Sequence, residues 1–299
     1  MKRFIVNIGL GVVAFMVMWF IAEYTMYHAD ICNKYSYKYN YVKGNPAIKT
    51  LLIGHSHFEN SINPYMMGDS VFDFAISGRR WIYWDMKLAE QLFPTMPNLK
   101  TVIFPLGYRM PYESPHYIEH SVFGMDYNLY MYSRYMHCPY DVFPDNIKYQ
   151  SALLSNRMGV KYWQSIEVDS LGYEKVEGMR DLWDEDFPIN FYEGEIAAKC
   201  YQEFIEYFIQ LAKVCYDNDI RFVVITCPCA DLYLAKIREQ GIKQLYDLID
   251  SVAAHYPIEY YNYMDDAEFR ADSLYFNCSH LNSSGADKFA IRVKNDLKL

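Results

Sequence analysis

Short apolar runs alternate with longer amphipathic stretches along most of this chain. The apolar runs are short and rich in β-branched and aromatic residues, as buried strands are. They fall at 48–54, 70–77, 99–107, 221–227 and 258–264. Apolar positions three and four residues apart predict helices over 81–93, 193–218, 231–256 and 283–297. The alternation predicts an α/β fold in which a parallel sheet carries helices on both faces.

The N-terminus follows a different pattern. Lys2 and Arg3 precede residues 4–22, which contain no charged side chain. A helix that rises about 1.5 Å per residue is just long enough here to span the hydrocarbon core of a bilayer. The basic residues should remain cytoplasmic, so we expect the rest of the chain outside the cytoplasm, on a single-pass anchor. A cleaved signal peptide is the alternative, but the apolar run is longer than a usual signal core.

These patterns divide the chain into three regions. We expect a membrane anchor or signal peptide at 1–23, a polar, tyrosine-rich linker at 24–48, and one α/β domain at 49–299. The stretch 108–192 breaks the alternation with Tyr, Pro, His and Met, and we expect it to be an insertion at the ligand-binding rim of the sheet.

Composition narrows the possible functions. A net charge of −9 argues against general binding to nucleic-acid phosphates. The seven cysteines form no recognisable disulfide framework and are expected to be buried thiols. The letters HYIEH at 116–120 fit an inverted zinc-protease motif. The neighbouring sequence leaves little room for the helix that this chemistry needs, so we expect neither a metal nor a cofactor.

His55, Ser56 and His57 come directly after the first predicted strand. Ligands of open parallel sheets bind beyond the carboxyl ends of the strands, so Ser56 is well placed for chemistry. A serine hydroxyl needs a base within hydrogen-bond reach to act as a nucleophile. Adjacent side chains generally diverge, which favours a more distant base over His55 or His57.

His280 is the candidate for that base. It lies after the last predicted strand and just before the final helix, where a loop would open on the same rim as Ser56. Asn282 or Ser283 could cap the helix and anchor that loop.

Three short segments together resemble the SGNH, or GDSL-type, hydrolase superfamily. They are IGHSH at 53–57, AISG at 75–78 and NCSHLNSSGA at 277–286. The last segment is especially similar to the membrane-anchored branch that works with cell-envelope acyl-transfer systems, such as D-alanylation and alginate O-acetylation. The resemblance covers about 49–107 and 219–297, and it implies a flavodoxin-like three-layer α/β/α sandwich and ester chemistry.

The resemblance also implies roles for individual residues. Ser56 would attack an acyl carbon, and His280 would take its proton. The backbone N–H groups of Ser56 and Gly78 would hold the resulting oxyanion.

Two positions depart from the superfamily pattern. Tyr108 and Arg109 stand where the superfamily has an asparagine that donates to the oxyanion, and either could donate instead. Asn277 stands where the superfamily has the aspartate that orients the histidine. A backbone carbonyl could orient His280 in its place, or a nearby carboxylate could substitute, from Asp265, Asp266 or Asp272.

The leading hypothesis is a membrane-anchored, extracytoplasmic esterase or O-acyltransferase that acts on acyl esters of an envelope polysaccharide. His55, His57 and Tyr108 are the expected substrate contacts. The alternative is a catalytically silent domain that binds a glycan or a membrane acyltransferase partner. Asn277 and the absence of the superfamily's oxyanion-donating asparagine favour the silent form, whereas Ser56 and His280 favour the enzyme.

Overall fold

A five-stranded parallel sheet forms the centre of the fold. The computed structural model describes residues 2–28, 34–76, 82–112, 114, 169–178, 194–237 and 239–299. The strands are β1 (Thr50–Leu52), β2 (Val71–Asp73), β3 (Thr101–Pro105), β4 (Arg221–Thr226) and β5 (Glu259–Asn262). Their order is β2-β1-β3-β4-β5, which is the flavodoxin-like order. All five predicted strands are confirmed, and the predicted α/β fold with them.

The register aligns the carboxyl ends of the central strands. Leu52 of β1 lies opposite Asp73 of β2 on one side and Ile103 of β3 on the other. From β1 the chain first adds β2 on one side and then adds β3, β4 and β5 in turn on the other side. The strand order therefore reverses between β1 and β3. Ligands of open α/β sheets bind in the crevice at such a point.

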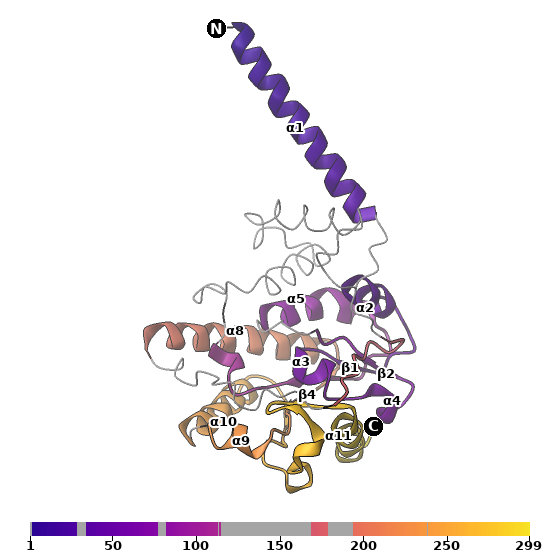
Figure 1. Cartoon of the computed structure of the whole chain (residues 1–299), viewed down its shortest axis with the longest axis vertical. Helices are drawn as coiled ribbons and strands as arrows, with labels where there is room; N and C mark the ends of the chain where they lie inside the picture. The colour runs from indigo at the N-terminus through magenta and orange to yellow at the C-terminus, as the bar shows by residue number, and fades with distance from the viewer. Residues whose placement is uncertain are drawn as a thin grey trace.

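Helices cover both faces of the sheet. On one face lie α5 (Ile82–Leu92), α8 (Glu195–Asp217) and α10 (Glu239–Ala253), and on the other lie α4 (Pro64–Met67) and α11 (Ser283–Leu297). Figure 1 shows α5 and α8 on one side of the strands and α11 on the other. Side chains alternate between the two cores, so that Val102 and Phe104 pack with Phe208 of α8, whereas Ile103 packs with Phe289 of α11. Each fully buried side chain of this kind stabilises the fold by about 1.5–3 kcal/mol.

The predicted helix 231–256 is wrong as a single element. It is divided into α9 (Asp231–Leu234) and α10, with turns between them. Ile237 in the connection is buried in the core with α8 and α10, whereas Leu232 of α9 is 40% exposed. The break lets the chain bury Ile237 while α9 lies over the carboxyl end of the sheet.

A small antiparallel hairpin precedes the last helix. It consists of β6 (Tyr275–Asn277) and β7 (His280–Leu281), and it follows the short 3₁₀ turns η5 (Ala267–Phe269) and η6 (Asp272–Leu274). His280 therefore lies in a hairpin strand rather than in the expected loop. Asn282 caps α11, because its side-chain oxygen accepts a hydrogen bond from Gly285 N.

The N-terminal helix α1 (Lys2–His28) extends away from the sheet and its helices (Figure 1). Its segment Arg3–Ile21 has a mean hydropathy of 2.4 and is long and apolar enough to cross a membrane. A signal sequence near the N-terminus satisfies the same criteria of length and composition.

Part of the segment 24–48, expected to be a linker, packs against the sheet. Residues Lys34–Val42 form helix α2. Val42 is fully buried, and the ring of Tyr41 stacks on Phe72 of β2 with 4.7 Å between centroids. The division of the chain at 23 and 48 stays a prediction.

Most of the expected insertion, 108–192, lies outside the described residues, but 169–178 is described and lies against β2. Asp73 N donates to Leu171 O at 2.9 Å. Gly172 has a φ of +83°, and a Cβ there would lie 2.1 Å from Asp73 O. Only glycine fits this close approach without a shift of the backbone.

Candidate active site

Ser56 lies just beyond the carboxyl end of β1, at the start of the short helix α3 (Ser56–Glu59). The turn before it depends on Gly54, which has a φ of +113° and whose missing Cβ would lie 2.4 Å from the ring of Pro105. His55 is the N-cap residue, and its side chain accepts from His57 N at 3.5 Å. As the first residue of a helix, Ser56 presents a backbone N–H that has no intrahelical acceptor.

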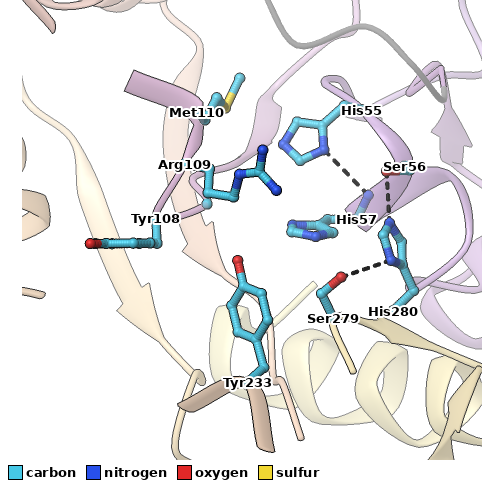
Figure 2. A pocket seen from close by; sticks show the side chains of 10 residues that line it. His55, Ser56, His57, Tyr108, Arg109, Met110, Tyr233, Ser279 and His280 are labelled. Atoms are coloured by element: carbon cyan, nitrogen blue, oxygen red, sulfur yellow. Dashed lines mark hydrogen bonds between the residues drawn. The ribbon is translucent and has the colours of Figure 1, made fainter. Parts of the chain in front are cut away.

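The structure brings Ser56 and His280 into direct contact. The distance from Ser56 Oγ to His280 Nε2 is 2.8 Å, although 224 positions separate the two residues in the chain. Figure 2 shows this hydrogen bond at one side of the pocket. The sequence predicted that these two distant residues lie at the same rim of the sheet, and the structure places them there.

The side-chain oxygen of Asn277 faces one of the two ring nitrogens of His280. This oxygen accepts from the backbone N–H groups of Ser279 at 3.0 Å and His280 at 2.9 Å. A backbone N–H group can only donate, so the Asn277 atom that these two groups contact must be the side-chain oxygen and not the NH₂ group. The same oxygen faces the imidazole ring. That oxygen lies 2.9 Å from His280 Nδ1, and because it can only accept, the contact favours a proton on Nδ1. Nε2 is left as an acceptor for the Ser56 hydroxyl, which is the tautomer that a general base requires.

Two of the three carboxylates that the sequence left open as partners of His280, those of Asp265 and Asp266, make other contacts. Asp265 pairs with Arg270 at 2.5 Å. Asp266 caps η5 by accepting from Glu268 N at 2.9 Å. His280 Nδ1 faces two side-chain oxygens, that of Asn277 at 2.9 Å and that of Ser279 at 3.0 Å, at the place where the sequence left a backbone carbonyl open as an alternative.

His55 and His57 form a row of imidazoles with His280. The rings of His57 and His280 meet edge to face with 4.8 Å between centroids, and the rings of His55 and His57 have the same separation. The row extends away from Ser56 along the pocket wall. Both residues therefore line the pocket, and a role for them in substrate contact stays a prediction.

The pocket beside Ser56 has a volume of about 520 Å³, part of which is open to solvent. Residues after β3 and a residue of α9 form the wall that faces the histidines. Figure 2 shows the guanidinium group of Arg109 pointing towards His55 and His57, and the hydroxyl of Tyr233 pointing into the pocket. The ring of Tyr108 points away from Ser56 and is buried in the core. Arg109 is therefore better placed than Tyr108 to meet a bound group.

Several lining residues were not predicted from the sequence. They are Gly107, Met110, Tyr233 and Ser279, and the Ser279 hydroxyl lies 3.0 Å from His280 Nδ1. Ser279 could have been found from its position next to His280. Tyr233 could not have been found, because it was expected in a helix over 231–256, and nothing in the sequence brings that helix to Ser56.

Two sequence predictions cannot be compared with this geometry. Gly78, the expected second oxyanion donor, and the HYIEH stretch at 116–120 lie outside the described residues. Within the described ranges, no group of three or more His, Cys, Asp or Glu side chains could hold a metal ion.

Comparison with protein families gave no match, and comparison with curated proteins gave none either. Solved structures of similar fold include a candidate acylhydrolase from Bacteroides fragilis, with 10% identity, a TM-score of 0.40, and coverage of 84% of this chain and 86% of that one. A GDSL-like lipase from Bacteroides thetaiotaomicron has 9% identity and a TM-score of 0.43, with 89% and 98% covered. A structure described as a candidate platelet activating factor from Streptococcus pneumonia has 10% identity and a TM-score of 0.38, with 97% and 98% covered.

Proposed function

We propose that this chain is a membrane-anchored serine esterase or O-acyltransferase that acts on acyl esters of a cell-envelope polysaccharide. The observation that carries the proposal is the 2.8 Å contact between Ser56 Oγ and His280 Nε2, on a ring whose Nδ1 faces the Asn277 oxygen at 2.9 Å. A nucleophile, a base and a group that orients the base are the parts that acyl transfer through serine requires.

In the proposed mechanism, Ser56 Oγ attacks the acyl carbon and His280 Nε2 takes the hydroxyl proton. The oxyanion that forms is held by the backbone N–H groups of Ser56 and Gly78, with Arg109 as a further donor. The ester C–O bond then breaks, and the leaving alcohol receives the proton from His280. Water, or a sugar hydroxyl, attacks the acyl-serine in the second half-reaction with His280 again as base. No step uses a metal or a cofactor.

The substrate and location in the proposal come from the sequence. The likeness of 277–286 to envelope acyl-transfer proteins supports a polysaccharide ester as substrate and a membrane-bound acyltransferase as partner. The length and apolar character of α1, with Lys2 and Arg3 before it, support an uncleaved anchor and an extracytoplasmic domain. We propose His55 and His57 as contacts to the bound ester.

One observation favours a catalytically silent domain as the second candidate. Asn277 carries no charge, so it stabilises a protonated His280 less than an aspartate would. A silent domain would use the same pocket to bind a glycan or an acyltransferase partner without forming an acyl-serine.

The full chain in detergent, treated with a fluorophosphonate probe and with p-nitrophenyl acetate, distinguishes the two candidates. We expect labelling and ester hydrolysis, and we expect Ser56→Ala to abolish both. Ser284→Ala removes an exposed hydroxyl on α11 and should react like the unmodified chain. A correctly folded chain that neither labels nor hydrolyses the ester would contradict the enzyme and favour the silent domain.

A further inference from the structure

A fully buried lysine lies beneath the segments that carry the candidate active site. Lys38 belongs to α2, and its side chain is 0% exposed. Lysine is almost never fully buried unless it is paired, because removing an ammonium group from water costs several kcal/mol. The contacts of Lys38 must compensate for that cost.

The contacts of Lys38 reach two separate segments of the chain. Its Nζ donates to Ala75 O at 2.5 Å and lies 3.5 Å from Glu59 Oε1. Glu59 is itself fully buried and is the last residue of α3, the helix that begins with Ser56. Ala75 lies in the segment that follows β2 and leads to Gly78.

A third buried group reinforces the same junction. Asp73 at the end of β2 is 0% exposed, and its Oδ1 accepts from Ala75 N at 2.8 Å. Lys38 and the Asp73 carboxyl interact electrostatically, and Glu59 adds a second acidic group nearby. The carbonyl and the N–H of Ala75 are thus both bound by side chains from this buried cluster.

We propose that Lys38 is a positioning residue that holds the Ser56 helix and the segment after β2 at a fixed spacing. The first segment carries Ser56, and the second leads in the sequence to Gly78; their backbone N–H groups are the proposed oxyanion donors, so the inference rests on the proposed function. Lys38 acts through α3 and Ala75 and does not contact the substrate. The helix that follows the membrane anchor is thereby a structural part of the active site.

The test compares variants of the full chain in detergent, with p-nitrophenyl acetate as substrate. Lys38→Met removes the ammonium group and should lower kcat by about 10- to 100-fold, which is less than the roughly 10²–10³-fold cost of losing one oxyanion donor outright. KM should change little, because the pocket walls are untouched. Lys38→Arg keeps a buried cation and donor and should restore part of kcat. Lys43→Met, an exposed lysine just after α2, is the matched control and should leave kcat unchanged.

A second variant separates positioning from stability. Lys38→Met alone leaves the buried Glu59 carboxylate without its cation, which destabilises the fold. Lys38→Met combined with Glu59→Gln removes both charges, so the melting temperature should recover while kcat stays low. A double variant with the kcat of the unmodified chain would overturn the inference.

Amide hydrogen exchange tests the same inference without catalysis. In the double variant, amides of 56–60 and 74–76 should exchange at least several-fold faster, while those of β4 stay protected. If the unmodified chain shows no esterase activity, the proposed function fails, and the exchange result still decides whether Lys38 holds the two segments. Unchanged exchange at both segments would refute the positioning role.

Discussion

The orientation of a single amide determines what His280 can do. An Asp-to-Asn change in a serine triad can cost about 10⁴ in rate, because the amide NH₂ group imposes the wrong imidazole tautomer. Here the backbone N–H groups of Ser279 and His280 bind the Asn277 oxygen and turn it towards the ring. In the proposed mechanism this orientation avoids the part of the rate loss that the wrong tautomer causes, and leaves only the part caused by the missing negative charge.

The Asn277→Asp variant tests whether the missing charge alone lowers the rate. The carboxylate keeps the same acceptor position and adds a charge-assisted hydrogen bond to the protonated ring, which is roughly twice as strong as a neutral one. A gain of about 1 kcal/mol corresponds to a rise in kcat of roughly fivefold. Steady-state hydrolysis of p-nitrophenyl acetate measures it, with the exposed Asn98→Asp as control. A rise of several thousandfold would show instead that Asn277 imposes the wrong tautomer.

The sequence predicted that Ser56 and His280 lie close together, but it did not predict the residues that hold them in place. Ser56 and His280 could be recognised because each follows a predicted strand in the right order along the chain. The buried Lys38 could not be, since its helix reads as polar and tyrosine-rich, and only the tertiary fold shows that this helix packs on β2. Gly54 carried a signal, because glycine between a strand and a helix often marks a positive φ.

At the scale of elements, the strands and the long helices were predictable because their hydrophobic periods are clear. The break between α9 and α10 was not, because the apolar spacing continues across it. The small hairpin β6–β7 was also not predicted, since each strand is only two or three residues long. This hairpin brings Asn277 and His280 together and places them over the start of α3.

The buried Asp73 carboxyl at the end of β2 should make the free energy of unfolding depend on pH. The pKa of Asp73 is raised from its ordinary 3.8 to about 7. Burial is the largest cause, Lys38 and the Ala75 N–H oppose it, and the nearby Glu59 and Asp169 carboxylates add to it. The buried Tyr173 side chain also interacts electrostatically with this carboxyl. Between about pH 4 and 7 the folded chain keeps a proton that the unfolded chain has lost, so this contribution to stability is present below pH 4 and is lost as the pH rises through 7.

Asp73→Asn removes that titration. The melting temperature of the unmodified chain, relative to that of the variant, should fall as the pH is raised from 4.5 to 8. Differential scanning calorimetry of both proteins measures the difference, and the exposed Asp69→Asn should follow the unmodified chain. A difference that stays constant or grows with pH would contradict the assignment.

At the scale of the whole molecule, the strand order explains where the site lies. β1 and β3 flank the point at which the order reverses, and the residues after them supply Ser56 and Arg109. The hairpin before α11 supplies His280 from the other end of the chain. The sequence predicted this arrangement through the order of strands and helices, whereas the pocket wall from α9 depends on packing that no local pattern reveals.

The proposed membrane anchor makes a separate prediction. If α1 is retained, the intact mass of the protein from a membrane preparation should include residues 2–28, and the protein should resist extraction with alkaline carbonate. Deletion of residues 2–28 should release it in soluble form. A mature N-terminus near residue 23 would show that α1 is a cleaved signal sequence.

Trapping the acyl-enzyme tests the central proposal most directly. The full chain is mixed with p-nitrophenyl acetate, quenched in acid within the first turnover, and digested for peptide mapping by mass spectrometry. We predict an acetyl group on Ser56 that is absent when His280 is replaced by glutamine. An acetyl group on another residue, or no acetyl group on a folded chain, would contradict nucleophilic catalysis by Ser56 and His280.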